Sequence, residues 1–144
     1  MKFADLADGG RQLAALLAPT LAPDAVVVSI GTGGLVTGAA LASSLGIVVT
    51  PLATSRTDAG VEVEVAFGVR GHEVVVVDDG VETGTAARAA ATALRAAGAR
   101  RIVLAVPVCP RDAEAELRLC FDSVVAVQRP LVRRSLHWHY ESFA

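Results

Sequence analysis

Short apolar runs recur along this chain, and polar loops or Ala-rich stretches separate them. The runs that predict strands are 25–30, 46–52, 73–77, 101–106 and 123–127. A nearly continuous series of Val, Ile and Leu is typical of a strand covered on both faces, as in a parallel sheet. Strands that alternate with helices at this spacing favour βαβ units. We therefore expect an α/β fold, doubly wound around a mostly parallel sheet of about five strands.

The stretches between these runs predict helices, one further strand and a loop. Apolar residues at helical spacing predict helices over 8–18, 35–45, 85–97 and 111–119. Segment 61–67 alternates apolar and polar residues, which predicts an exposed or edge strand, and the polar segment 54–60 before it is expected to be a loop. A length of 144 residues is typical of one domain, so we expect a single domain over 1–144.

The composition excludes several classes of protein. A hydrophobic fraction of 53% with 19% charged residues excludes a disordered chain. The net charge of −2 gives no support for nucleic-acid binding. No apolar stretch is long enough to cross a membrane, no secretory signal is evident, and two cysteines are too few for a disulfide framework. We expect a cytoplasmic protein with neither nucleic acid nor membrane as partner.

The segment 74–86, VVVVDDGVETGTA, places two adjacent acids at the end of a buried strand. Desolvating Asp78 and Asp79 side by side is costly, so solvent, ligand hydroxyls or a metal must compensate. The Gly- and Thr-rich loop that follows opens a helix, and backbone N–H groups there suit a phosphate. This arrangement predicts a sugar-phosphate site. The alternative is that the acids cap a turn and Thr85 caps the helix.

This segment resembles the motif with which type I phosphoribosyltransferases bind phosphoribosyl pyrophosphate (PRPP). The resemblance implies that Asp78 and Asp79 contact the ribose hydroxyls and are the candidate catalytic residues. It implies a loop for the 5-phosphate, formed by Gly80, Val81, Glu82, Thr83, Gly84 and Thr85. It also implies Mg²⁺ bound with PRPP, a homodimer, and transfer of the phosphoribosyl group to a nitrogenous base with release of pyrophosphate.

A second strand–loop–helix segment, SIGTGGLVTG at 29–38, contains a glycine cluster. In the family, the loop after the first strand binds pyrophosphate through backbone amides, and many bacterial members have Pro-Arg-Gly-Gly there. Here Gly33 and Gly34 match this run, whereas Gly31 and Thr32 replace Pro and Arg. The resemblance implies a pyrophosphate loop over these four residues without the positive charge. The alternative is that the glycines only let a strand turn into a helix.

The resemblance extends over most of residues 8–144, to an uncharacterised bacterial subgroup of the family. Segments 69–72 and 99–110 and the tail HWHYESF carry it. Members of that subgroup have a long insert before the Asp-Asp strand, which includes a flexible loop that closes over PRPP. Here only residues 52–71 span this gap. Arg56 is the cation of the shortened loop.

The tail around Trp138 has no function that the sequence alone identifies. His137 and His139 would share a face on a strand, but no Cys or acid at ligand spacing completes a zinc site. We therefore expect no metal held by protein ligands alone, and we expect the tail to pack on the sheet edge or on a second subunit. The family recognises its acceptor base through variable segments, and here residues 1–10 or the tail around Trp138 and Tyr140 are candidates.

Three functions stay open at this point. The first is an active phosphoribosyltransferase. The second is a catalytically reduced relative that binds PRPP or a nucleotide as a regulatory ligand, which Thr32 and the short loop favour. The third is a structural or oligomerisation module on the same fold, because a fold does not fix a function.

Overall fold

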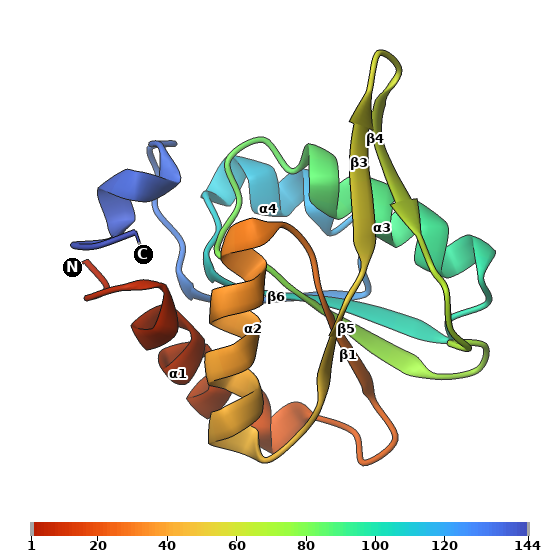
Figure 1. The fold of residues 1–144 in the computed structure, drawn as a ribbon. Coiled ribbons are helices and arrows are strands. Elements are labelled where there is room, and N and C mark those ends of the chain that lie inside the picture. The colour runs from red at the N-terminus through yellow and green to blue at the C-terminus, as the bar shows by residue number, and fades with distance from the viewer. Residues whose placement is uncertain (1, 144) are drawn as a thin grey trace.

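A five-stranded parallel sheet forms the centre of the computed structural model, which describes residues 2–143 (Figure 1). The strand order is β2-β1-β5-β6-β7, and all neighbours are parallel. The strands are β1 (Val26–Ser29), β2 (Val49–Pro51), β5 (Glu73–Val77), β6 (Arg101–Val108) and β7 (Ser123–Gln128). The predicted α/β fold with a parallel sheet of about five strands is confirmed.

Helices cover both faces of this sheet, as a doubly wound fold requires. The helices are α1 (Leu6–Leu17), α2 (Thr32–Leu45), α3 (Thr85–Ala96) and α4 (Arg111–Leu117), with short 3₁₀ turns η1 (Ala18–Thr20) and η2 (Leu136–His139). Val75 and Val77 of β5 pack with residues of α1 and α2, whereas Val74 and Val76 pack with residues of α3 and α4. The alternation of side chains along one strand thus serves two separate cores. No helix among residues 2–143 is long and apolar enough to cross a membrane.

The loop predicted over 54–60 is wrong, because most of this segment is a strand. Strand β3 (Ala53–Thr57) pairs antiparallel with strand β4 (Gly60–Glu64), and Arg56 lies opposite Val61. This pairing satisfies the backbone groups of a polar stretch that has no apolar pattern of its own. The edge strand predicted at 61–67 is present as β4, whose half-buried valines alternate with exposed Glu62 and Glu64. Figure 1 shows the hairpin projecting beside α3.

Several element boundaries differ from the sequence expectation, and two of these differences concern the glycine cluster and Pro107. Helix α2 begins at Thr32 rather than at residue 35, so most of the glycine cluster forms its first turn. The predicted end of the fourth strand at Pro107 is also wrong, since β6 runs on to Val108, which pairs with Gln128. The ladder between β5 and β6 has already ended at Ala105, so Pro107 removes no bond to β5.

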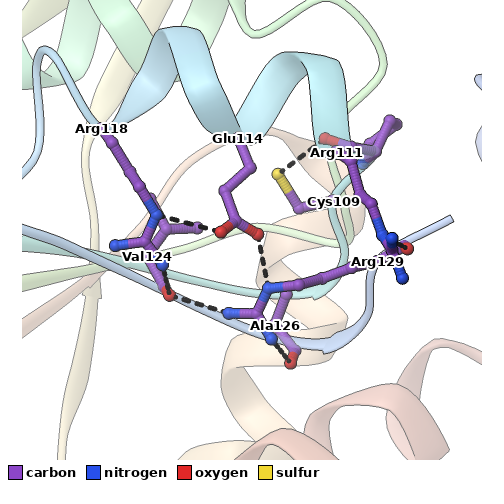
Figure 2. Close-up of polar contacts among 8 residues, drawn as sticks. Cys109, Arg111, Glu114, Arg118, Val124, Ala126 and Arg129 are labelled. Atoms are coloured by element: carbon purple, nitrogen blue, oxygen red, sulfur yellow. Dashed lines mark hydrogen bonds and ion pairs between the residues drawn. The ribbon is translucent and has the colours of Figure 1, made fainter. Parts of the chain in front are cut away.

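An ion cluster fixes α4 to the last strand of the sheet (Figure 2). Glu114 of α4 accepts hydrogen bonds from Arg118, at 3.0 Å, and from Arg129. Arg129 also donates to the carbonyls of Val124 and Ala126, at 3.0 and 3.1 Å. Burial raises the pKa of Glu114, but the hydrogen bonds from the two arginines outweigh it, so the net pKa is lowered.

Both cysteines are free thiols. Cys109 is fully buried beside this cluster, and its thiol donates to the carbonyl of Pro110 (Figure 2). Burial raises the pKa of this thiol to about 11, so it stays protonated at neutral pH. Cys109 is therefore an unreactive residue of the core.

Close packing of α1 on α2 depends on Gly10. A Cβ atom at Gly10 would lie 2.4 Å from the carbonyl oxygen of Thr37 and 3.0 Å from Cβ of Ala40. Thr37 is itself buried and donates to the carbonyl of Leu6 at 3.4 Å. The two helix backbones approach so closely that no side chain fits between them at this position.

We predict that Gly10→Ala destabilises the protein, although alanine is the better helix former by about 1 kcal/mol. The added methyl group forces the helices apart, and we expect a loss of about 1–3 kcal/mol in the free energy of unfolding, measured in urea. Ser43→Ala, on the exposed side of α2, introduces the same residue without a close contact and should leave stability nearly unchanged. A Gly10→Ala variant as stable as the parent would contradict this account.

We also predict that Glu114→Gln lowers the free energy of unfolding at pH 7 by about 1–2 kcal/mol, because charge-assisted hydrogen bonds are lost. A lowered pKa stabilises the fold above the unfolded pKa, and that stability is lost as the pH falls through the folded pKa. The difference between parent and variant should therefore shrink below about pH 4. Glu116→Gln is the control on the same helix, since its exposed ion pair with Arg88 at 3.6 Å contributes little.

Candidate functional site

Two loops meet where β1 and β5 end. These strands are neighbours, and the chain leaves β1 toward the edge strand β2 but leaves β5 toward β6 on the other side. The strand order therefore changes direction here, and ligands of open α/β sheets bind at such a point, beyond the carboxyl ends of the strands. The glycine cluster, defined as Gly31 to Gly34, follows β1, and the Asp-Asp loop, defined as residues 78–84, follows β5.

The two carboxylates of the Asp-Asp loop lie against the glycine cluster. Oδ2 of Asp79 is only 2.0 Å from the position that a Cβ atom of Gly33 would occupy. Oδ1 of Asp78 lies 3.2 Å from the corresponding position at Gly34 and 3.5 Å from that at Gly31. Gly31 also has φ of +76°, a left-handed conformation that favours glycine. The glycines thus do more than let a strand turn into a helix. They also leave room for two acidic side chains at the start of α2.

Both acids resist ionisation in this position. Burial raises the pKa of Asp78 well above its ordinary value, and the charge of Asp79 raises it further. Burial also raises the pKa of Asp79, against a hydrogen bond with Asp78 that lowers it. The backbone N–H of Asp79 donates to Oδ1 of Asp78 at 2.7 Å. A half-buried and a buried carboxyl group, both with raised pKa values, form a site that favours a cation or hydroxyl donors.

The loop between the acids and α3 contains two glycines with positive φ and leads into the N-terminus of that helix. Gly80 has φ of +148° and Gly84 has φ of +81°. The N-cap of α3 is Gly84, without a side-chain hydrogen bond, so the alternative in which Thr85 caps the helix is wrong. The hydroxyls of Thr83 and Thr85 lie 3.2 Å apart on the exposed side. A helix N-terminus with two adjacent hydroxyls is chemically suited to an anion.

Two adjoining hollows lie over these loops. The first, the acid hollow, has about 580 Å³ including space open to solvent. Its lining is Arg56, Asp78, Asp79, Gly80, Val81, Glu82, Thr83, Gly84, Thr85, Ala86, Ala87, Leu104 and Leu136. The second, the glycine hollow, has about 620 Å³ measured in the same way, and its lining is Gly31, Thr32, Thr54, Ser55, Arg56, Val61 and Ala86. Arg56 of the hairpin lines both.

The structure brings the sequence-predicted site residues to one place. Residues 78–85 line the acid hollow, while Gly31 and Thr32 line the glycine hollow. Gly33 and Gly34 lie beneath the two carboxylates. Arg56, which was predicted on a loop, reaches the site from β3 instead.

The tail packs in part on the sheet edge, one of the two predicted alternatives, because Tyr140 and Phe143 share a cluster with Val127 of the edge strand β7. Packing on a second subunit stays a prediction. The tail also lies over the Asp-Asp loop, where Leu136 becomes part of the acid hollow. Leu136 and Tyr140 carry no local sign of this contact in the sequence, beyond the aromatic character of the tail. His137 and His139 lie on η2, where His139 is buried and the ring of His137 contacts Phe143, with centroids 4.0 Å apart. Among residues 2–143, no three His, Cys, Asp or Glu side chains form a metal-binding group.

Solved structures share this fold along most or all of the chain. A Thermus thermophilus protein, TT1426, covers 100% of this chain and 92% of its own, with a TM-score of 0.86 at 23% identity. The adenine phosphoribosyltransferase of Giardia lamblia, solved with 9-deazaadenine, covers 88% and 80%, with a TM-score of 0.69 at 20% identity. A hypoxanthine-guanine phosphoribosyltransferase of Bacillus anthracis covers 88% and 77%, with a TM-score of 0.65 at 18% identity.

Sequence comparison points in the same direction. Two Mycobacterium tuberculosis proteins, from strains CDC 1551 and H37Rv, are named as phosphoribosyl transferases and are 27% identical to this chain over 192 aligned residues. The alignment covers 98% of this chain but only 43% of theirs, so the chain spans less than half the length of these relatives. The sequence model of the phosphoribosyl transferase domain matches residues 6–133. The chain therefore belongs to the phosphoribosyl transferase domain family.

Proposed function

We propose that this protein binds Mg-PRPP and transfers the phosphoribosyl group to a nitrogenous base, with release of pyrophosphate. The observation that carries the proposal is the placement of two adjacent carboxylates, Asp79 buried and Asp78 half-buried, between an anion-suited loop and the glycine cluster. The two hollows thus present an anion-suited loop, then two carboxylates, then backbone amides. A ribose with a phosphate group at one end and pyrophosphate at the other matches this order.

Each part of the site takes one part of the substrate. Asp78 and Asp79 hold the ribose hydroxyls, because carboxylates accept hydrogen bonds from hydroxyl groups. The loop from Gly80 to Thr85 binds the 5-phosphate with backbone amides and the hydroxyls of Thr83 and Thr85. The glycine cluster provides the amides at the start of α2 for pyrophosphate. Arg56, which lines both hollows, provides positive charge between the two phosphate sites.

A divalent cation fits the charge of this site. Asp78, Asp79 and Glu82 line the acid hollow with Arg56, so the described lining has more negative than positive side chains. Mg²⁺ prefers oxygen ligands and keeps several waters, so one or two carboxylates beside substrate oxygens are sufficient to bind it. Asp78 and Asp79 would hold the ion together with PRPP. When bound, the ion neutralises part of the charge on the departing pyrophosphate.

The reaction requires the protein to position groups and to stabilise charge. The bond between C1 of the ribose and a pyrophosphate oxygen breaks, a bond between C1 and a nitrogen of the base forms, and the proton of that nitrogen is released. The transition state has oxocarbenium character at C1. Carboxylates that hold the ribose fix the position of C1, while amides and Arg56 stabilise the leaving group.

A regulatory PRPP- or nucleotide-binding protein is the second candidate. Thr32 stands where many bacterial relatives of this type have an arginine, and the short hairpin brings one arginine to the hollows. The two candidates bind the same ligand but differ in turnover. Release of pyrophosphate from Mg-PRPP is assayed with a panel of nitrogenous bases. Release supports the transferase, whereas tight binding of Mg-PRPP without release supports the regulatory protein.

Several expectations stay predictions. They are a nitrogenous base as the acceptor, the homodimer, the cytoplasmic setting and the single domain over 1–144. Light scattering of the purified chain measures the oligomeric state directly.

We predict that Asp79→Asn abolishes most of the stabilisation by Mg-PRPP. A ligand at 100 times its Kd adds about 2.7 kcal/mol, which raises the melting temperature of the parent by several degrees. The variant should show little shift, because an amide replaces a carboxylate that accepts ribose hydrogen bonds. Asp24→Asn, at the opposite end of β1, should retain the full shift. No shift of the parent at millimolar Mg-PRPP would overturn the transferase and the regulatory protein that binds PRPP.

We predict that Asp78→Asn makes the unliganded protein more stable at pH 7, by a few degrees in melting temperature. A carboxyl whose pKa is raised by folding stabilises the fold only while it is protonated, and this contribution is lost as the pH rises through the folded pKa. The difference between parent and variant should therefore disappear below about pH 4. A variant that is less stable than the parent at pH 7 would show that Asp78 has a structural role in the turn instead.

A further inference from the structure

The C-terminal tail binds the Asp-Asp loop through two hydrogen bonds. The hydroxyl of Tyr140 donates to the backbone carbonyl of Asp79 at 2.5 Å. The backbone N–H of Leu136 donates to Oε1 of Glu82 at 2.7 Å. A segment of five residues in the tail therefore holds both ends of the stretch 79–82.

Gly80 lies between these two contacts and has a backbone conformation that favours glycine. It has φ of +148°, and glycine reaches a wider range of φ than any other residue. The carbonyl group of Asp79 that accepts from Tyr140 belongs to the peptide bond that precedes Gly80. The side chain of Leu136 covers Gly80, since a Cβ atom there would lie 2.5 Å from Cδ2 of Leu136.

Tyr140 is itself held in place by the N-terminal segment. Its buried ring packs on Phe3, with centroids 5.3 Å apart. The backbone of Phe3 donates to His139 at 2.9 Å and accepts from Glu141 at 2.8 Å. Figure 1 shows the two terminal segments side by side at this end of the sheet. Gly9 of α1 leaves room for the hydroxyl, because a Cβ atom there would lie 3.2 Å from Oη of Tyr140.

The hydroxyl remains a donor over the physiological pH range. Burial raises the pKa of Tyr140, and the charges of Asp79 and Asp78 raise it further. The family match ends at residue 133, before Leu136 and Tyr140. The contact therefore lies outside the part of the chain that the family description covers.

We propose that Tyr140 is a positioning residue of the PRPP site, which holds the carbonyl of Asp79 and thereby keeps the loop 79–85 in the conformation that binds substrate. Leu136 acts with it by covering Gly80 and closing one wall of the acid hollow. Asp79 carries both the carbonyl that is held and the carboxylate that lies on Gly33, so fixing the first restrains the second. This proposal rests on the proposed function, because Mg-PRPP is the substrate it names.

Tyr140→Phe tests the proposal, since it removes one hydroxyl and keeps the packed ring. Hydrogen–deuterium exchange of the unliganded protein should become faster in peptides covering 79–85. Calorimetry should show Mg-PRPP binding about tenfold weaker, the usual scale for one buried hydrogen bond. Leu136→Ala keeps the tyrosine but uncovers Gly80, and it should also speed exchange in 79–85. Ser43→Ala is the control, because it also removes one hydroxyl but from the exposed side of α2, and it should change neither quantity.

The two readouts separate the proposal from the function on which it rests. Exchange in 79–85 that stays at the parent rate in Tyr140→Phe overturns the positioning role, whether or not PRPP binds. Faster exchange with unchanged Mg-PRPP affinity also overturns it. A parent protein that does not bind Mg-PRPP overturns the proposed function, and with it the assignment of a substrate to the loop that Tyr140 holds.

Discussion

Two adjacent carboxyl groups at the end of a buried strand determine which residues can surround them in this structure. The pairing of β1 with β5 brings Ser29 level with Val77, and the N–H of Ile30 donates to the carbonyl of Val77 at 3.0 Å. The strands therefore end together, and the acids that follow β5 meet the glycines that follow β1. Position 33 must therefore be glycine, because Asp79 occupies the space that any side chain there would need.

The sequence was sufficient for the sheet and the two loops because their signals are local. Four valines followed by two acids identify β5 and its end without knowledge of any other segment, and Gly46 ends α2 as predicted, with φ of +66°. The hairpin and the tail were not predictable in this way. Arg56 lies on a strand only because Val61 pairs with it, and Tyr140 meets Asp79 across 61 residues of sequence. Such contacts depend on the assembled fold, which no local pattern specifies.

The acids also bear on which function the fold serves. Burial raises the pKa values of Asp78 and Asp79, so their ionised forms oppose folding at neutral pH. A module that only had to fold would be more stable with uncharged residues at both positions. Destabilising groups are typical of sites where a ligand compensates for them. This argument favours the two ligand-binding functions over a purely structural role.

The hairpin bears on the choice between those two functions. Its base is anchored on both sides, because Leu52 is buried and donates to Ser29 at 2.8 Å, while Val63 and Phe67 pack on the core. Arg56 is thus held over the hollows without the entropy cost of ordering a long loop. A long loop would exclude water more completely, and exclusion of water matters for the reaction more than for binding. We therefore expect a short hairpin to limit turnover before it limits affinity, so the release of pyrophosphate, and not the binding of a ligand, distinguishes an enzyme from a regulatory protein on this scaffold.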